Sequence, residues 1–94
     1  MIQVRIYRAV NGRSTNRVFW RQGAFRELPR IGETVVLTNF GCIPVADVAH
    51  NPDHNSLDIY LKADNSPQRE RPNLNIDETT FQFYRDQGWH QDEI

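Results

Sequence analysis

Cysteine is almost absent from this sequence of 94 residues, and the one cysteine present, Cys42, has no second thiol with which to form an internal disulfide. This excludes a disulfide-stabilised fold and favours a reducing compartment such as the cytoplasm. No apolar run approaches the roughly 20 residues that span a bilayer, and no cationic and apolar leader precedes the first strand-like segment. We therefore expect a cytoplasmic protein with no membrane contact and no classical export signal.

Lysine is equally scarce, because ten of the eleven basic residues are arginine and only Lys62 is not. Arginine favours planar, bidentate contacts with carboxylates or phosphates, and stacking on aromatic rings. Residues 1–30 hold seven arginines and one acidic residue, whereas residues 31–94 hold eleven acidic residues and four basic ones, so the net charge is only −1. The uneven layout permits a basic surface, but the overall charge does not indicate a nucleic-acid-binding protein.

Catalytic motifs are also missing. The sequence contains no GxSxG, no GxxxxGK[ST] and no HExxH pattern, and paired carboxylates occur only near its end, at Asp92 and Glu93. Cys42 and His50 are a conceivable nucleophile and base, but a single cysteine in an apolar strand is more typical of a small buried hydrophobic residue. The sequence therefore does not predict an enzyme, and it predicts no cofactor.

Alternating hydrophobicity is the strongest positive signal. In IQVRIY, Ile2, Val4 and Ile6 alternate with polar or amphipathic residues, as in a strand that is buried on one face. The apolar phase slips between Val45 and Val48, which is typical of a β-bulge. Turn residues separate five such segments, at positions 2–7, 17–21, 34–39, 40–50 and 57–63.

The remaining residues predict a linker and a helix. Residues 64–75 are polar and contain two prolines, as linkers do. Asp77 suits the N-cap of a helix over residues 78–87, and Gly88 suits the position after its end, with Trp89 folding back onto Tyr84. A sixth strand through residues 80–84 is the alternative.

These elements predict a mainly β (α+β) fold, with a small, strongly curved, five-stranded antiparallel sheet or partly open barrel and a C-terminal helix. The predicted parts are residues 1–63 for the sheet, 64–75 for the linker and 76–94 for the helical tail, which packs in the same domain or docks on a neighbouring copy. The runs LPRIGETVVL, VADVAH and LDIYLK resemble the strand-and-turn pattern of small curled β-barrel domains in general, and imply no particular function.

One predicted site is a face that mixes arginines with aromatic rings. If position 6 lies opposite position 18 in the first hairpin, Val18 and Trp20 share the inner face with Val4 and Ile6. The outer face then carries the candidate ligand- or partner-binding residues, which are Arg5, Tyr7, Arg17, Phe19 and Arg21. Such a face could bind an anionic ligand or single-stranded nucleic acid, or it could simply be the solvated face of the sheet.

Two further groups of residues are candidate sites. His50, Asp53 and His54 could contribute to a metal site, but a structural zinc site needs four ligands, and Asp53 and His54 are ordinary turn residues, so no metal site is predicted. The aromatic residues of the tail are the candidate oligomer interface, because small domains without disulfides often gain stability by association. These interface residues are Phe81, Phe83, Tyr84 and Trp89.

The sequence thus predicts a small, non-catalytic binding or interaction protein that forms a homo-oligomer, a dimer or larger, through its aromatic helix. The alternative is a binder of an anionic ligand or single-stranded nucleic acid on the face of arginines and rings.

Overall fold

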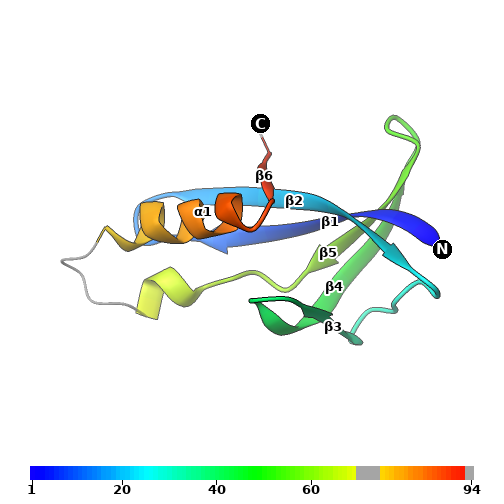
Figure 1. Ribbon diagram of the computed structural model, residues 1–94, viewed down its shortest axis with the longest axis horizontal. Helices are drawn as coiled ribbons and strands as arrows, with labels where there is room; N and C mark the ends of the chain where they lie inside the picture. The colour runs from blue at the N-terminus through cyan, green and yellow to red at the C-terminus, as the bar shows by residue number, and fades with distance from the viewer. Residues whose placement is uncertain (70–74, 93–94) are drawn as a thin grey trace. The chain divides into compact units, whose positions relative to one another are not determined.

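Six strands and one α-helix make up the part of the chain that the computed structural model describes, residues 1–69 and 75–92 (Figure 1). The sheet order is β3-β4-β5-β1-β2-β6. The predicted mainly β fold with a C-terminal helix is confirmed. The elements are β1 (Ile2–Asn11), β2 (Asn16–Phe25), β3 (Thr34–Leu37), β4 (Gly41–Asn51), β5 (Ser56–Leu61), a 3₁₀ turn η1 (Ser66–Arg69), α1 (Ile76–Asp86) and β6 (His90–Gln91).

The sheet is mixed rather than antiparallel, and it has six strands rather than five. β1 pairs with β5 in parallel, with Val4 next to Leu57 and Tyr7 next to Tyr60, and the short β6 is added beside β2. The sheet ends at β3 and β6, so it is not closed into a barrel. Alternation along a strand shows which face is buried but not which strands pair or in which direction, which is why the sequence did not predict the parallel pair.

The chain divides into two compact units, one formed by residues 1–7 and 22–62 and the other by residues 8–21 and 63–94. Both units contain part of β1 and part of β2. In the first unit, the predicted slip of the apolar phase is confirmed as a register shift between Val45 and Asp47, where β4 pairs with β5. The buried apolar residues of this unit are Val4, Ile6, Val35, Ile43, Val45, Ile59 and Leu61.

The register predicted for the first hairpin is wrong. The loop is a four-residue turn, closed by the N–H of Gly12 donating to the carbonyl of Thr15 at 3.1 Å. With this loop, Phe19 is 0% exposed and shares a face with Arg8, since both side chains contact Tyr84. Odd positions of β2 therefore lie with even positions of β1, because a shift of one residue in pairing moves every side chain of a strand to the opposite face.

In the second unit, α1 lies alongside β2 (Figure 1). The segment 80–84 is helical, so the alternative of a sixth strand there is wrong. The helix begins earlier than predicted, with Asn75 at the N-cap and no side-chain cap bond. Gly88 follows the helix with φ 89°, and the N–H of Trp89 donates to the carbonyl of Tyr84 at 3.0 Å. The predicted glycine-terminated helix end is confirmed.

The predicted linker is structured over the part that is described. Asp64 forms an isolated parallel bridge with Val10, in which its N–H donates to Ala9 and its carbonyl accepts from Asn11, both at 2.8 Å. Residues 66–69 then form η1, with Pro67 buried. Residues 70–74 of the predicted linker lie outside the described residues.

Candidate functional site

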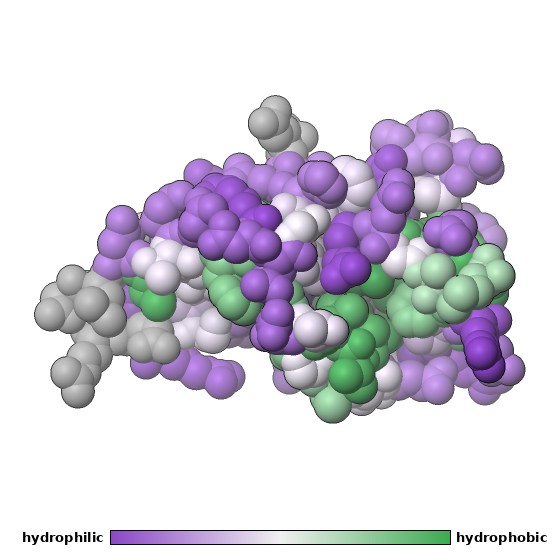
Figure 2. Space-filling model, viewed as in Figure 1, coloured by the Kyte–Doolittle hydropathy of each residue, from purple (hydrophilic) through white to green (hydrophobic). Residues whose placement is uncertain are grey.

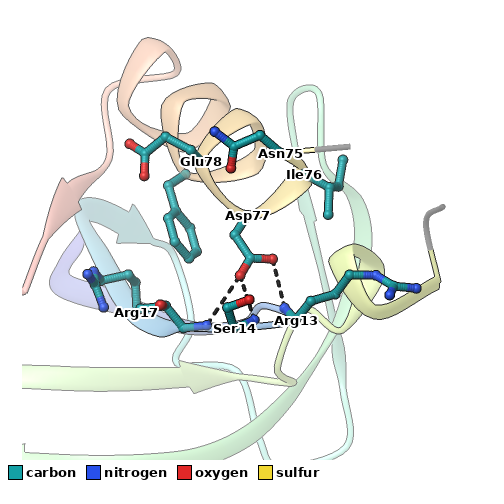
Figure 3. Close-up of a pocket in the computed structure, with 9 residues that line it drawn as sticks. Arg13, Ser14, Arg17, Asn75, Ile76, Asp77 and Glu78 are labelled. Carbon is teal, nitrogen blue, oxygen red and sulfur yellow. Dashed lines mark hydrogen bonds between the residues drawn. The ribbon is translucent and has the colours of Figure 1, made fainter. Parts of the chain in front are cut away.

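A cleft of about 460 Å³ lies in the second unit, between the β1–β2 turn and the start of α1 (Figure 3). Its centre is Asp77, whose carboxylate accepts backbone N–H bonds from Arg13 at 2.7 Å, Ser14 at 2.8 Å and Thr15 at 3.2 Å. The bonds from Ser14 and then from Arg13 lower the pKa of Asp77 below its ordinary value of 3.8, because they stabilise the ionised carboxylate. Asp77, predicted as a helix cap, therefore binds the hairpin turn instead.

Two arginines that line this cleft also make contacts within the chain. The Arg13 guanidinium donates to the carbonyls of Pro67 at 3.2 Å and Gln68 at 3.3 Å, and the Arg17 guanidinium lies 5.7 Å from the centre of the Phe81 ring. Gly12 has no room for a side chain, because an added Cβ would lie 2.6 Å from the Asp77 carboxyl and would also clash with the Thr15 carbonyl. These contacts hold the start of α1 against the turn between β1 and β2. The polar groups of the cleft therefore stabilise the fold.

Replacing Asp77 with asparagine tests the contribution of this carboxylate to the stability of the fold. We expect a lower melting temperature for D77N than for the unsubstituted protein at neutral pH. Because the folded-state pKa of Asp77 is lowered, the stabilisation is fully present above the unfolded value of 3.8 and is lost as the pH falls through the folded value. The difference between the two proteins should therefore shrink below about pH 4, as measured by thermal circular dichroism over a pH series.

The matched control for this test is Asp53→Asn, an exposed carboxylate in the turn between β4 and β5. It should leave the melting temperature unchanged across the pH series. Equal melting temperatures for D77N and the unsubstituted protein at neutral pH, or a difference that persists at pH 2, would contradict the role given to Asp77.

A second buried network joins α1 to the strands of the same unit. The Tyr84 hydroxyl donates to Asp64 at 2.6 Å and accepts from Arg8 at 3.0 Å, and Arg8 lies 3.9 Å from the Asp64 carboxylate. Burial, and then the bond to Asp64, raises the pKa of Tyr84. Burial raises the pKa of Asp64, but the bonds from Tyr84 and Ser66 outweigh it and the net pKa is lowered. Tyr84 therefore stays neutral and Asp64 ionised near neutral pH.

The five predicted binding residues are divided between the two units. In the second unit, Phe19 stacks on Tyr84, with ring centres 5.0 Å apart, and Arg21 lies 6.0 Å from the Trp89 ring. Together with Arg17 over Phe81, these residues contact α1 or Trp89, which follows it, within their own chain. The prediction that Phe19 lies on a solvated face is wrong, because the pairing of the hairpin differs from the predicted one and turns the Phe19 ring toward Tyr84 of α1.

In the first unit, Tyr7 stacks on Tyr60, with ring centres 5.1 Å apart and an interplanar angle of 18°. Arg5 pairs in register with Asp58, which is 1% exposed and accepts hydrogen bonds from Ser56 at 2.9 Å and Asn51 at 3.3 Å. A negative charge thus lies on the same face of the sheet as Arg5. Whether Arg5 and Tyr7 bind a ligand stays a prediction.

Three of the four predicted interface residues are buried within the chain itself. Phe81, Tyr84 and Trp89 belong to the core of the second unit, and the predicted contact of Trp89 with Tyr84 is confirmed by ring centres 5.6 Å apart. Only Phe83, which is 42% exposed, presents much surface. The structure therefore shows the helix packed on its own chain. This is one of the two arrangements that the sequence left open, the other being docking on a neighbouring copy.

The residues considered for metal binding and catalysis do not form a centre. Across residues 1–69 and 75–92, no three His, Cys, Asp or Glu side chains gather in a group that could hold a metal ion, so His50, Asp53 and His54 do not form one. Cys42 is exposed rather than buried as its apolar strand suggested. The cleft that His50 lines is formed with Gln3, Asn51 and their neighbours, and Cys42 does not line it.

The feature that sequence reasoning missed is the free edge of β3. Val36 in this strand is 72% exposed and pairs with the exposed Cys42 of β4. The sequence contains a sign that one of these residues is exposed, because residues 35–37 are all apolar. Neighbouring side chains of a strand point to opposite faces, so Val36 cannot face the same core as Val35 and Leu37.

Comparison with known proteins gives no family for this chain, since no family model, no curated protein and no solved structure matches it. Within the described residues, no helix is long and apolar enough to cross a membrane.

Proposed function

We propose that this chain is a non-catalytic interaction domain that self-associates, and that it does so through the free edge of β3 rather than through α1. The observation that carries the proposal is the exposure of Val36, 72%, in the middle of a strand at the end of the sheet. A reducing compartment such as the cytoplasm suits the exposed thiol of Cys42 beside it.

The edge of β3 has backbone groups available for pairing. The Glu33 carbonyl accepts the Val45 N–H at 2.8 Å, and Val35 and Leu37 pair with Ile43 and Gly41 further along β4. Because alternate residues of a strand bond to opposite sides, the N–H and C=O groups of Thr34 and Val36 point away from β4. Within the described part of the chain, no strand lies on that side, so these groups can pair with an added strand.

The composition of β3 does not protect this edge. Natural edge strands usually carry charged residues, prolines or bulges that prevent pairing with other chains. The strand Thr34–Leu37 has none of these, and Ile31 shortly before it is 64% exposed. The hydropathy surface shows a hydrophobic patch over the β3–β4 hairpin (Figure 2). An exposed, uncharged, β-branched edge is typical of a site of strand addition.

A second copy of the chain is the partner that fits this edge best. Most homodimers have two-fold symmetry. Two β3 strands that are related by a two-fold axis perpendicular to the sheet run antiparallel and can pair. The only charge in residues 33–38 is Glu33, which would lie near the uncharged Thr38 of the other copy. No like charges meet in this pairing, and the Val36 side chains of the two copies lie close to each other on one face of the joined sheet. The other end of the sheet, β6, has only two residues and offers little to pair with.

The alternative of an extended nucleic-acid-binding face has lost its support in the second unit. Arg17 and Arg21 lie over Phe81 and Trp89 of their own chain, and Phe19 is buried. A stacking platform needs exposed rings beside cations, as in known single-strand-binding proteins. The observations therefore favour self-association over nucleic-acid binding.

Replacing Val36 with lysine tests the proposal. Strand pairing brings the two residues at position 36 close together, and like charges that face each other across a strand pair repel, so we expect the dissociation constant of the dimer to rise roughly fivefold. Light scattering over a concentration series should give twice the mass of one chain for the unsubstituted protein, and a shift toward one chain for V36K. The matched control is Phe83→Lys on α1, which should still dimerise. A monomeric unsubstituted protein, or a V36K variant that dimerises unchanged, would contradict the proposal.

A further inference from the structure

Two adjoining clefts lie in the first unit, where β1 and β5 meet the turn between β4 and β5. The smaller, of about 330 Å³, is lined by Gln3, Arg5, Gln22, His54 and Asn55, among others. The larger, of about 500 Å³, shares Gln3 and Asn55 with it and adds His50. This end of the unit has no role in the self-association proposed above.

Several local features bring these side chains together. Gln3 and Arg5 alternate in β1 with the buried Val4, so both point away from the core of the unit. After β4, the chain turns with the Asn55 N–H bonded to the Pro52 carbonyl at 3.3 Å and Asn55 in the left-handed region at φ 50°. Asparagine tolerates this conformation, and the turn places His54 and Asn55 beside Gln3.

The polar side chains that line the clefts include several hydrogen-bond donors. Arg5 contributes a guanidinium, Gln3 and Asn55 contribute amides, and the imidazoles come from His54 and, in the larger cleft, His50. Among the residues that the structure describes, no acidic side chain lines either cleft. In the described part of the chain, the side chains of Gln3, His54 and Asn55 have no hydrogen-bond or ion-pair partner. Such a set of donors suits the oxygen atoms of a carboxylate or phosphate.

We infer that the smaller cleft binds a small anion that carries a phosphate or carboxylate group, with Arg5 as the charged anchor and with Gln3, His54 and Asn55 as hydrogen-bond donors. The guanidinium at the centre disfavours a metal cation, and a single arginine is too few for an extended polyanion. This binding is independent of self-association.

The buried carboxylate of Asp58 limits the strength of binding. It pairs in register with Arg5 but does not line the clefts, and its oxygens accept from Ser56 and Asn51. Its negative charge opposes an incoming anion, so we expect dissociation constants of about 1 mM for simple ions, which is weak on the affinity scale.

Titration followed by NMR of backbone amides tests the inference, with inorganic phosphate and acetate as separate probes at constant ionic strength. We expect chemical-shift changes at Gln3, His54 and Asn55 that saturate with at least one probe. The probe with the lower dissociation constant identifies the preferred group, phosphate or carboxylate. The Arg5→Gln variant should bind about tenfold more weakly. Its matched control is Arg26→Gln, an exposed arginine of the same unit that does not line the cleft.

Should R5Q fail to fold, as judged by its amide spectrum, His54→Asn takes its place and should weaken binding about threefold, in proportion to the loss of one donor. Shifts that do not saturate with either probe would overturn the inference. So would R26Q weakening the binding as much as R5Q, or binding by R5Q or H54N that is as tight as that of the unsubstituted protein.

Discussion

Replacing Phe19 with alanine is expected to destabilise the protein by about 3–5 kcal/mol, the range measured when a buried phenylalanine is removed from a core. Phe19 is 0% exposed and its ring packs between Tyr84, at 5.0 Å, and Phe81, at 5.9 Å. The substitution removes both ring contacts and leaves a cavity between β2 and α1. Urea denaturation followed by circular dichroism measures the loss of unfolding free energy.

Phe83→Ala is the matched comparison, because it removes the same ring from a position that is 42% exposed. Its cost should be about 1 kcal/mol or less, as for most surface substitutions. Were Phe19 on a solvated face, as the sequence pattern suggests, the two variants would lose similar and small amounts of stability. Equal, small losses would thus contradict the packing of α1 on β2.

Much of the fold follows from local sequence. The alternation of Val4 and Ile6 with polar residues, the slip of phase after Val45 and the glycine at position 88 each predict a feature that the structure contains. Each of these signals depends only on residues that are close together in the sequence. Strand pairing depends on distant segments, and so the parallel contact of β1 with β5 was not predictable from alternation.

The face that β2 presents depends on the loop before it. A turn closed between Gly12 and Thr15 sets the pairing of the whole hairpin, and a loop shorter or longer by one residue would place Val18 and Trp20 where Phe19 and Arg21 now lie. The residues Asn11 to Asn16 are compatible with more than one turn. Asp77 binds this turn from more than sixty residues away in the sequence. A local sequence pattern cannot include such a contact, so it did not indicate which turn forms.

The same reasoning explains the change of candidate site. Aromatic residues in a tail suggest an interface as readily as a core, and only the packing of Phe81, Tyr84 and Trp89 on β2 distinguishes the two. Val36, by contrast, is 72% exposed and belongs to no core, and its strand ends the sheet. The edge position of a strand is a property of topology, and the apolar run of residues 35–37 does not reveal it by itself.

Cysteine crosslinking distinguishes the two surfaces directly. In a protein that also carries Cys42→Ser, Val36→Cys places the only thiol at the centre of the free edge. Antiparallel pairing of two β3 strands brings the two introduced thiols either opposite each other or one diagonal apart, with separations of about 5–8 Å. Phe83→Cys in the same background places the thiol instead on the exposed face of α1.

The most direct test of the central claim, that β3 is the self-associating surface, is the yield of covalent dimer from these two variants with a bismaleimide of about 8 Å reach. The β3 edge predicts nearly complete crosslinking of V36C and little crosslinking of F83C. Efficient crosslinking of F83C with none of V36C would return the interface to the helix. No crosslinking of either variant would contradict self-association through both surfaces.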